Sequence, residues 1–185
     1  AIFSVLKLGA AYVPIDPENP ESRKEYIAKD SQIKLLITHD LLRNEHPFYD
    51  GPTLYMPDCV VAPKTSVAPF ISGATRADLA YIMYTSGSTG LPKGTLISNY
   101  NISRVVLDTN YINISKDDKI LQLSNYAFDG SVFGIYGALL NGAELHTVTK
   151  DISSDVKNLG ERIRTSNISV LFVTTAYFNT LIEYA

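Results

Sequence analysis

Residues 84–94, Tyr-Thr-Ser-Gly-Ser-Thr-Gly-Leu-Pro-Lys-Gly, concentrate hydroxyl groups and glycines in front of a lysine. Glycines permit positive φ values and close approach of the backbone, so N–H groups can surround a bound anion, while hydroxyls donate further hydrogen bonds. The lysine adds positive charge. These residue types favour a loop that binds polyphosphate. The alternative that composition leaves open is a flexible surface linker.

The spacing within this loop differs from two common nucleotide-binding patterns. A Walker A loop requires G-x-x-x-x-G-K-[ST], but the chain has Pro92 where a second glycine would have to follow Gly87. The loop also lacks G-x-G-x-x-G, which gives no support to a dinucleotide-binding fold. It does follow a predicted apolar strand at 79–84, and this position argues against a plain linker.

Strand-like and helix-like segments alternate over most of the chain. Residues 39–78 carry prolines at irregular intervals and are expected to be mostly irregular, with one or two short strands. Continuous apolar strands alternating with helices predict an α/β fold, in which helices cover both faces of a mostly parallel sheet. The strands are predicted at 33–38, 79–84, 119–123, 143–148 and 168–173, and the helices at 2–11, 21–30, 100–109, 131–140, 154–164 and 175–184.

Composition excludes several classes of partner. The 185 residues suffice for one domain with its own core. Sixteen basic and nineteen acidic residues give a net charge of −3, whereas nucleic-acid and anionic-membrane surfaces need a basic excess. No apolar run approaches the ~20 residues of a membrane-spanning helix. We therefore expect no nucleic acid and no membrane as partners.

The remaining reactive residue types give little chemistry. Cys59 is the single cysteine, so no internal disulfide is possible, and a reducing compartment is favoured. Residues 1–30 show no charged segment followed by an apolar one, as a secretory signal would. His39, His46 and His146 lack metal-ligand spacing. The sequence predicts a cytoplasmic protein with no metal site and no catalytic residue within this chain.

Both ends of the chain resemble the ends of a fragment. The chain begins at Ala1, in the middle of a helical pattern and without methionine, and it stops at Ala185 directly after a predicted helix. We therefore expect residues 1–185 to be one partial domain, truncated at both ends.

The loop at 84–94 resembles the signature of the AMP-forming acyl-adenylating superfamily, which includes acyl-CoA ligases, luciferase-like enzymes and nonribosomal peptide synthetase adenylation domains. Two further segments resemble the peptide synthetase branch. Residues 6–23, LKLGAAYVPIDPENPESR, resemble its early motif LK-[AS]-G-[GA]-AYVPIDP, and residues 128–133, FDGSVF, resemble its FD-x-S motif. The resemblance implies part of the large N-terminal subdomain of an AMP-binding adenylation domain.

This resemblance implies an ATP-dependent ligase that joins a carboxylate to AMP, releases pyrophosphate and passes the acyl group to a thiol. In the peptide synthetase branch the acid is an amino acid, and the thiol is the phosphopantetheine of a peptidyl carrier domain, in secondary metabolite biosynthesis. ATP and Mg²⁺ are the implied cofactors. The adenine, ribose and most magnesium contacts and the catalytic lysine are expected beyond residue 185, so we expect this fragment to be inactive by itself.

The resemblance also implies which residues hold the β- and γ-phosphates of ATP. Lys93 would add charge or have a structural role, and Pro92 would fix the exit of the loop. The residues implied to bind phosphate are Thr85, Ser86, Gly87, Ser88, Thr89, Gly90, Lys93 and Gly94.

Asp129, together with Phe128, matches the family position that pairs with the α-ammonium group of an amino acid. A buried carboxylate without a cation is costly, so an amino acid would complete the pocket. Spacing by itself favours another role, in which Asp129 or Ser131 caps the helix predicted at 131–140.

Gly130, Phe133 and Phe172 match positions that line the side-chain pocket in the family. The combination Asp-Gly-Phe-Phe resembles the start of the pattern for isoleucine and similar aliphatic substrates. Two aromatic rings without a second charge also suit an apolar side chain. The alternative is that Phe133 and Phe172 are ordinary core residues.

Two other functions remain open. A fatty-acyl or aryl-acid CoA ligase would carry the same phosphate loop but would not need Asp129, because its substrates have no amino group. A non-catalytic fold fragment could instead associate through an exposed sheet edge.

Overall fold

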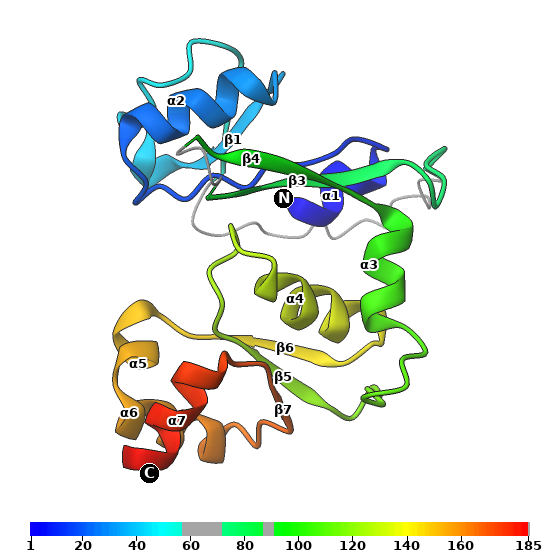
Figure 1. Cartoon of the computed structure of the whole chain (residues 1–185), viewed down its shortest axis with the longest axis vertical. Coiled ribbons are helices and arrows are strands. Elements are labelled where there is room, and N and C mark those ends of the chain that lie inside the picture. Colours follow the sequence, from blue (N-terminus) through cyan, green and yellow to red (C-terminus); the bar gives the residue numbers. More distant parts are fainter. Residues whose placement is uncertain (57–71, 87–90, 185) are drawn as a thin grey trace, which may run out of the picture. The chain divides into compact units, whose positions relative to one another are not determined.

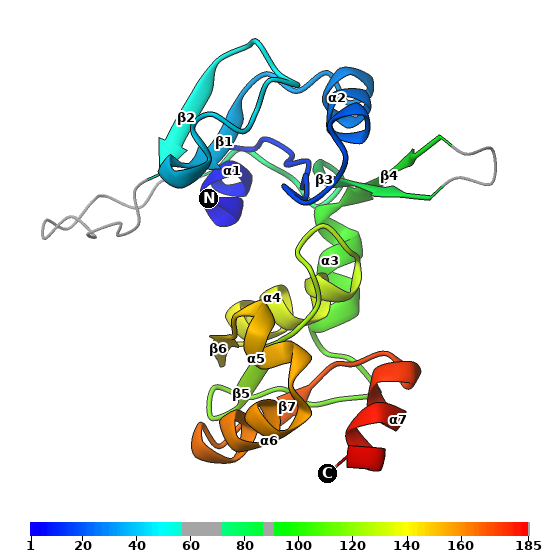
Figure 2. The ribbon, with the colours of Figure 1, turned by 90° about the vertical axis from the view of Figure 1, so that its left-hand side faces the viewer.

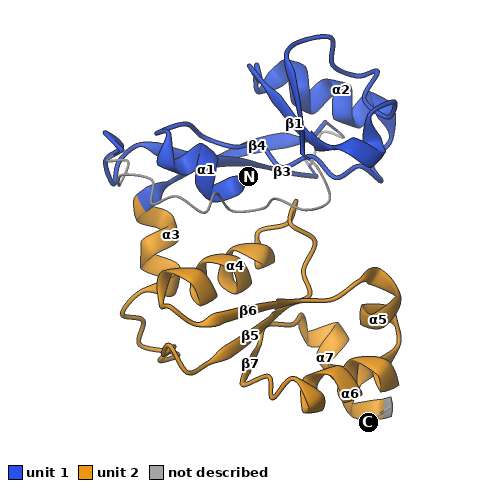
Figure 3. Cartoon of the chain, turned by 180° about the vertical axis from the view of Figure 1, so that it is seen from behind, with its two compact units in different colours: residues 1–99 blue, residues 100–185 orange. Residues whose placement is uncertain are grey.

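The computed structural model describes residues 1–56, 72–86 and 91–184 as an assembly of short strands and helices (Figure 1). The chain divides into two compact units, residues 1–99 and residues 100–185 (Figure 3). Each unit has its own strands, helices and buried side chains. None of the helices within the described ranges is both long and apolar enough to span a membrane.

Unit 1 contains two small sheets (Figure 2). Strands β1 and β2 are parallel, whereas β3 and β4 form an antiparallel pair. The elements of unit 1 are α1 (Ile2–Lys7), α2 (Glu21–Asp30), β1 (Leu36–His39), the 3₁₀ turn η1 (Asp40–Leu42), β2 (Thr53–Met56), β3 (Leu79–Thr85) and β4 (Lys93–Ser98).

Strand β3 is the most buried strand of unit 1, as its run of apolar residues predicts. Tyr12, in the extended segment after α1, lies alongside it. The Tyr12 N–H donates to the Ala80 carbonyl at 3.0 Å, and the Ile82 N–H donates to the Tyr12 carbonyl at 3.0 Å. The rings of Tyr12 and Tyr81 also contact, with centroids 5.4 Å apart. The early segment therefore packs along the strand that leads into the glycine-rich loop.

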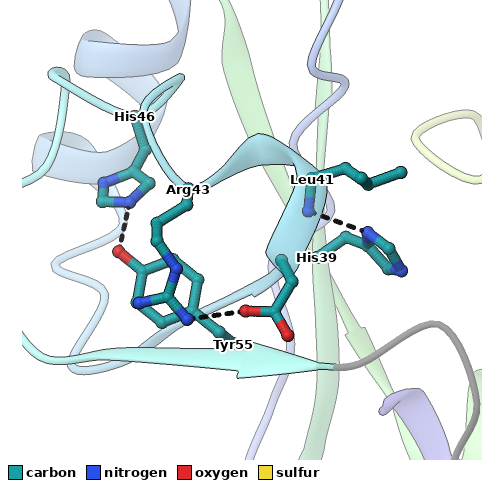
Figure 4. A network of polar contacts seen from close by, with 6 residues as sticks. His39, Leu41, Arg43, His46 and Tyr55 are labelled. Atoms are coloured by element: carbon teal, nitrogen blue, oxygen red, sulfur yellow. Dashed lines mark hydrogen bonds and ion pairs between the residues drawn. The ribbon is translucent and has the colours of Figure 1, made fainter.

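Polar contacts connect β1 and β2 around the Tyr55 ring (Figure 4). His46 Nε2 lies 2.6 Å from the Tyr55 hydroxyl, and the Arg43 guanidinium lies over the Tyr55 ring, 3.9 Å from its centroid. The same guanidinium donates to Asp40 Oδ1 at 2.6 Å. At the start of η1, His39 Nδ1 accepts from the Leu41 N–H at 3.1 Å. Through these contacts, residues of the connection between β1 and β2 pack against the Tyr55 ring.

Unit 2 is built on a three-stranded parallel sheet with β5 in the centre, in the order β6-β5-β7. Helix α4 lies on one side of this sheet, and α6 and α7 lie on the other (Figures 1 and 3). The elements are α3 (Asn99–Val106), β5 (Lys119–Gln122), α4 (Gly130–Leu140), β6 (Glu144–Thr147), α5 (Lys150–Ser154), α6 (Val156–Thr165), β7 (Val170–Leu171) and α7 (Thr175–Tyr184).

The core of unit 2 follows from the apolar pattern of β5 and its covering helices. Ile120 and Leu121 of β5 are fully buried, as are Ala138 of α4 and Leu159 of α6. Helix α4 stops at Asn141, and Gly142 follows with φ +73°, a backbone conformation that favours glycine. The central strand is thus buried on both faces, as in parallel sheets generally.

The α/β fold with mostly parallel strands is confirmed, and the helices at 21–30 and 175–184 have the predicted bounds. Residues Lys93–Ser98, for which no strand was predicted, form β4, which pairs antiparallel with β3. The helix expected at 2–11 ends at Lys7, and the strand expected at 168–173 is limited to Val170–Leu171. The helix expected at 154–164 is found as α6, which begins at Val156 because Asp155 is extended and its carboxylate accepts from the Lys157 and Asn158 N–H groups.

Candidate functional site

The predicted phosphate-binding residues that are described lie at the end of the β3–β4 hairpin. Thr85 pairs with Lys93 in the final register pair, and both side chains are exposed, as is Ser86 next to Thr85. Pro92 is buried at the start of β4. Two hydroxyls and one ammonium group therefore stand at the same end of one hairpin, a combination that can bind an anion.

The central part of the predicted loop lies outside the described residues. This concerns the predicted phosphate-binding residues Gly87, Ser88, Thr89 and Gly90. Their predicted role stays a prediction. The structure adds that the strands on the two sides of this segment, β3 and β4, are paired with each other.

Gly94 has a steric role within the hairpin. A Cβ atom at this position would lie 2.9 Å from Ile82 Cγ2 and 3.0 Å from Tyr84 Cζ. Both side chains belong to β3, the strand to which Gly94 is paired. Glycine at this position lets them pack across β4, a requirement that is separate from any contact with phosphate.

Three of the predicted amino-acid-binding residues come together in unit 2. The Phe133 and Phe172 rings contact with centroids 5.5 Å apart. A Cβ on Gly130 would lie 3.1 Å from Phe172 Cε1 and 3.0 Å from Ser124 Oγ, so the glycine backbone lies against the same aromatic pair. We call Gly130, Phe133 and Phe172 the aromatic floor. Phe172 is 43% exposed, which is more than a core residue would be, so an apolar ligand could cover it.

Asp129 stands next to the aromatic floor in the sequence, at the N-terminus of α4, and its side chain is exposed. The sequence argument from a buried, unpaired carboxylate therefore does not apply to this structure. Within the described part of the chain, the Asp129 carboxylate accepts no capping hydrogen bond from α4, and its own backbone is helical, with φ −59° and ψ −31°. Asp129 therefore does not cap α4 with its side chain, and this side chain is exposed to solvent.

Ser131 is buried, and its hydroxyl bonds backward along the chain, not forward into the helix. It donates to the Phe128 carbonyl at 2.7 Å, and the Phe128 N–H donates to the Asn125 carbonyl at 2.9 Å. The Phe128 side chain itself is 65% exposed. These bonds fold residues 125–131 into a tight turn that carries Phe128 and Asp129 on its outer surface.

Gln122, a residue that the sequence analysis missed, contributes to this turn. It is the last residue of β5, and its Nε2 donates to the Ser124 carbonyl at 2.7 Å. Its side-chain amide occupies the space beside α4 that a Cβ at Gly134 would need, since such a Cβ would lie 1.9 Å from Gln122 Oε1. A polar residue at the carboxyl end of a buried strand was the signal that could have identified it.

The described residues offer no magnesium cage. In the ranges 1–56, 72–86 and 91–184, no group of three or more His, Cys, Asp or Glu side chains is placed to hold a metal ion. Mg²⁺ in nucleotide sites is commonly bound by substrate phosphates and one or two carboxylates. The residues predicted to bind phosphate belong to unit 1, and those predicted to bind an amino acid belong to unit 2.

Comparisons with known proteins agree over nearly the whole chain. The family model described as AMP-binding enzyme matches residues 1–185. Among curated proteins, bacitracin synthase 1 of Bacillus licheniformis is 47% identical over 182 residues, which cover 98% of this chain and 3% of that protein. The chain thus spans a small part of the curated relatives that it matches.

Two solved structures show the same fold. The N-terminal subdomain of Klebsiella oxytoca NpsA, in complex with 3-hydroxybenzoyl-AMSN, matches with a TM-score of 0.78 and 28% identity, over 98% of this chain and 45% of that one. The four-domain nonribosomal peptide synthetase holo-AB3403, bound to AMP and glycine, matches with a TM-score of 0.80 and 28% identity, over 99% of this chain and 13% of that one.

Proposed function

The chain belongs to the AMP-binding enzyme family, and on that premise we propose that it forms part of an adenylation domain that activates an amino acid in nonribosomal peptide synthesis. The observation that carries the proposal is the 47% identity to bacitracin synthase 1 over 98% of the chain. The aromatic floor beside Asp129 supports the choice of an amino acid as the substrate.

The proposed reaction has two steps. A carboxylate oxygen of the amino acid attacks the α-phosphorus of ATP, and the bond from that phosphorus to the bridging oxygen breaks, so that pyrophosphate leaves. The thiol of a phosphopantetheine on a peptidyl carrier domain then attacks the acyl carbon, and AMP leaves. Catalysis of the first step depends on alignment of the reacting groups and on neutralisation of phosphate charge.

In this proposal the end of the β3–β4 hairpin binds the leaving phosphates. The hydroxyls of Thr85 and Ser86 would donate hydrogen bonds to the β- and γ-phosphates, and the Lys93 ammonium would offset their charge. Gly87, Ser88, Thr89 and Gly90 would complete the loop with backbone N–H groups. Mg²⁺ would enter with ATP, since the described residues provide no metal cage.

The Asp129 carboxylate would pair with the α-ammonium group of the substrate, and the aromatic floor would contact its side chain. The exposed carboxylate supports this assignment, because it is available to a ligand. Two rings without a neighbouring charge suit a branched aliphatic side chain, such as that of isoleucine. Phe128 would lie at the rim of the pocket.

The proposal extends to the context of the chain. The 185 residues correspond to 45% of the NpsA N-terminal subdomain, which supports a role within a longer domain and not as an active enzyme by themselves. Such a domain would act in the biosynthesis of a secondary metabolite. A cytoplasmic location would give it access to ATP.

The test is amino-acid-dependent exchange of pyrophosphate into ATP by the protein at its natural length, with a panel of amino acids. We expect exchange with branched aliphatic amino acids. Asp129→Ala should lower kcat/KM for the amino acid roughly thirtyfold or more, because loss of one member of a charge pair covered by the ligand costs about 2–5 kcal/mol.

Asp117→Ala is the matched control, since Asp117 is an exposed aspartate in a turn of the same unit. It should leave the exchange unchanged. Full activity of the Asp129→Ala variant, or activation of fatty or aryl acids in place of amino acids, would contradict the proposal and favour a CoA ligase. The absence of any acid-dependent exchange would favour a non-catalytic protein.

A further inference from the structure

The side chains of Tyr84 and Asp30 connect two elements that are distant in the sequence. The Tyr84 hydroxyl donates to Asp30 Oδ2 across 2.5 Å, and the two residues are 54 positions apart. Tyr84 is in β3 and is 7% exposed, whereas Asp30 is the exposed last residue of α2. A hydrogen bond to a carboxylate is shorter and stronger than one between neutral groups. The contact therefore fastens β3 to the end of α2 (Figure 2).

The Tyr84 ring is held from two further directions. Tyr26, one helical turn before Asp30, meets the ring edge-on, with centroids 6.5 Å apart and an interplanar angle of 90°. On β4, the absence of a side chain at Gly94 leaves room for the ring, since a Cβ there would lie 3.0 Å from Tyr84 Cζ and 3.3 Å from its hydroxyl oxygen. The ring is thus packed between α2 and the strand paired with its own.

Tyr84 lies near the end of β3 that leads into the hairpin connection. It pairs with Gly94, and the next pair, Thr85 with Lys93, is the last one before the connection. Successive side chains of a strand point to opposite faces, so fixing the orientation of Tyr84 also fixes that of Thr85. The anchored pair, Tyr84 with Gly94, is therefore directly next to the pair whose side chains stand at the connection end of the hairpin.

Burial raises the pKa of the Tyr84 hydroxyl, and the hydrogen bond to Asp30 and the charge of Asp30 raise that pKa further. The hydroxyl therefore stays protonated at neutral pH and remains a donor. Asp30 Oδ2 is the acceptor of this hydrogen bond.

We propose that Asp30 and Tyr84 are positioning residues for ATP, whose hydrogen bond anchors the connection end of the β3–β4 hairpin to α2 and so holds Thr85 and Lys93 in place for the phosphates. The inference rests on the proposed function for the identity of the ligand. The anchor itself rests on contacts within unit 1. Neither residue is assigned a contact with substrate.

The first experiment measures KM for ATP and for the amino acid in the protein at its natural length. Tyr84→Phe and Asp30→Ala should each raise the KM for ATP about tenfold, the effect of losing a hydrogen bond to a charged group. The KM for the amino acid should not change. Asp30→Asn keeps an acceptor oxygen and should stay within about threefold of the natural protein. The double variant should be no worse than either single one, because both remove the same bond.

Tyr55→Phe is the matched control, because it removes a hydrogen-bonded hydroxyl from the other sheet of unit 1, where Tyr55 contacts His46. It should leave both KM values unchanged. An equal rise of the KM for ATP in Tyr55→Phe and Tyr84→Phe would show a general loss of stability and would overturn the proposal. So would unchanged KM values in Tyr84→Phe and Asp30→Ala.

A second measurement tests the anchor independently of activity. In the 185-residue chain, amide hydrogen exchange of the paired residues Thr85 and Lys93 should be about tenfold faster in Tyr84→Phe and unchanged in Tyr55→Phe. Equal exchange in the Tyr84→Phe variant and the natural chain would refute the anchor whatever reaction the protein catalyses. Faster exchange in a protein that shows no amino-acid-dependent activity would support the anchor and contradict the proposed function.

Discussion

The β3–β4 hairpin of unit 1 and the β5–α4 segment of unit 2 are introduced by the same kind of turn but present their functional residues in different ways. Before β3, Asp78 Oδ2 accepts from the Thr75 N–H at 2.6 Å, and before β5, Asp118 Oδ2 accepts from the Ser115 N–H at 2.7 Å. Each turn is followed by a buried strand and then by residues of the candidate site.

Beyond the turns the two segments diverge. The hairpin returns in β4, and its candidate phosphate residues are held by a backbone ladder. The chain after β5 instead enters α4, and the aromatic floor is formed by side-chain packing between α4 and the residue after β7. A ladder fixes backbone groups regardless of side-chain size, which suits a ligand common to all reactions, such as ATP. Side-chain packing can change from one protein to another, which suits a variable amino acid.

The largest effect is expected from Gly94→Ala in the hairpin. The new Cβ would lie 2.9 Å from Ile82 Cγ2 and 3.0 Å from Tyr84 Cζ, so the variant should lower the free energy of unfolding by about 1–3 kcal/mol through overpacking. It should also raise the KM for ATP with every amino acid tested. Urea denaturation of the 185-residue chain gives the first quantity, and pyrophosphate exchange gives the second.

Gly73→Ala is the control for this variant, since no heavy atom of the described residues lies within 4 Å of a Cβ built there. It should be close to neutral in both assays. If Gly94→Ala were equally neutral, the packing of Tyr84 across β4 would not constrain the hairpin, and the contrast between the two segments would lose its basis.

We expect Phe172→Ala, in the aromatic floor, to lower stability less than Gly94→Ala does. It should, however, change the choice of amino-acid substrate selectively. Phe172 is 43% exposed, so its loss should cost about 1 kcal/mol of stability, less than for a fully buried phenylalanine. The KM for a branched aliphatic amino acid should rise about tenfold, as expected for the loss of an apolar contact of 1–2 kcal/mol, with the KM for ATP unchanged.

Phe178→Ala removes a ring of similar exposure, 51%, from α7 and is the matched control. It should leave amino-acid selectivity as it was. If Phe172→Ala raised the KM for ATP as much as the KM for the amino acid, the proposed separation would be wrong. ATP binding would then not depend on the hairpin alone, nor amino-acid binding on the β5–α4 segment alone.

The smallest effect concerns pH. Hydrogen bonds from Thr75 lower the pKa of Asp78, and bonds from Ser115, together with one from the Ser169 hydroxyl, lower the pKa of Asp118 below the ordinary range of an aspartate. Because both pKa values are lower in the folded chain, both carboxylates stabilise it above about pH 4, and this stabilisation is lost as the pH falls through the folded-state pKa values.

Asp118 has the additional partner in Ser169, at 2.8 Å, so unit 2 should be the more sensitive to acid. Asp118→Asn should therefore reduce the difference between the urea midpoints at neutral pH and at about pH 3 more than Asp78→Asn does. The reverse order of the two variants would show that the Ser169 contact adds nothing to this turn.

Part of the fold followed from local sequence because local geometry suffices to specify it. Helix α2 follows Pro20 and α4 ends before Gly142, and residues of these types stop or start helices wherever they occur. The start of α6 is equally local, since aspartate is a strong N-cap and Asp155 directly precedes the helix. Strand β4 was not predicted because Lys93 and Gly94 belong to the glycine-rich motif, although Thr95 and Ile97 are typical strand residues.

By itself the sequence determined the chemical character of the two sites: a hydroxyl- and glycine-rich loop with a lysine, and an aspartate beside apolar residues. It also determined the alternation of strands and helices, because both depend on residues close together in the chain. Only the tertiary structure decided which distant residues meet, as Tyr84 does with Asp30 and Asp118 with Ser169. Such contacts depend on how the elements pack after the chain has folded, and no periodicity or motif within one segment specifies the partner from another.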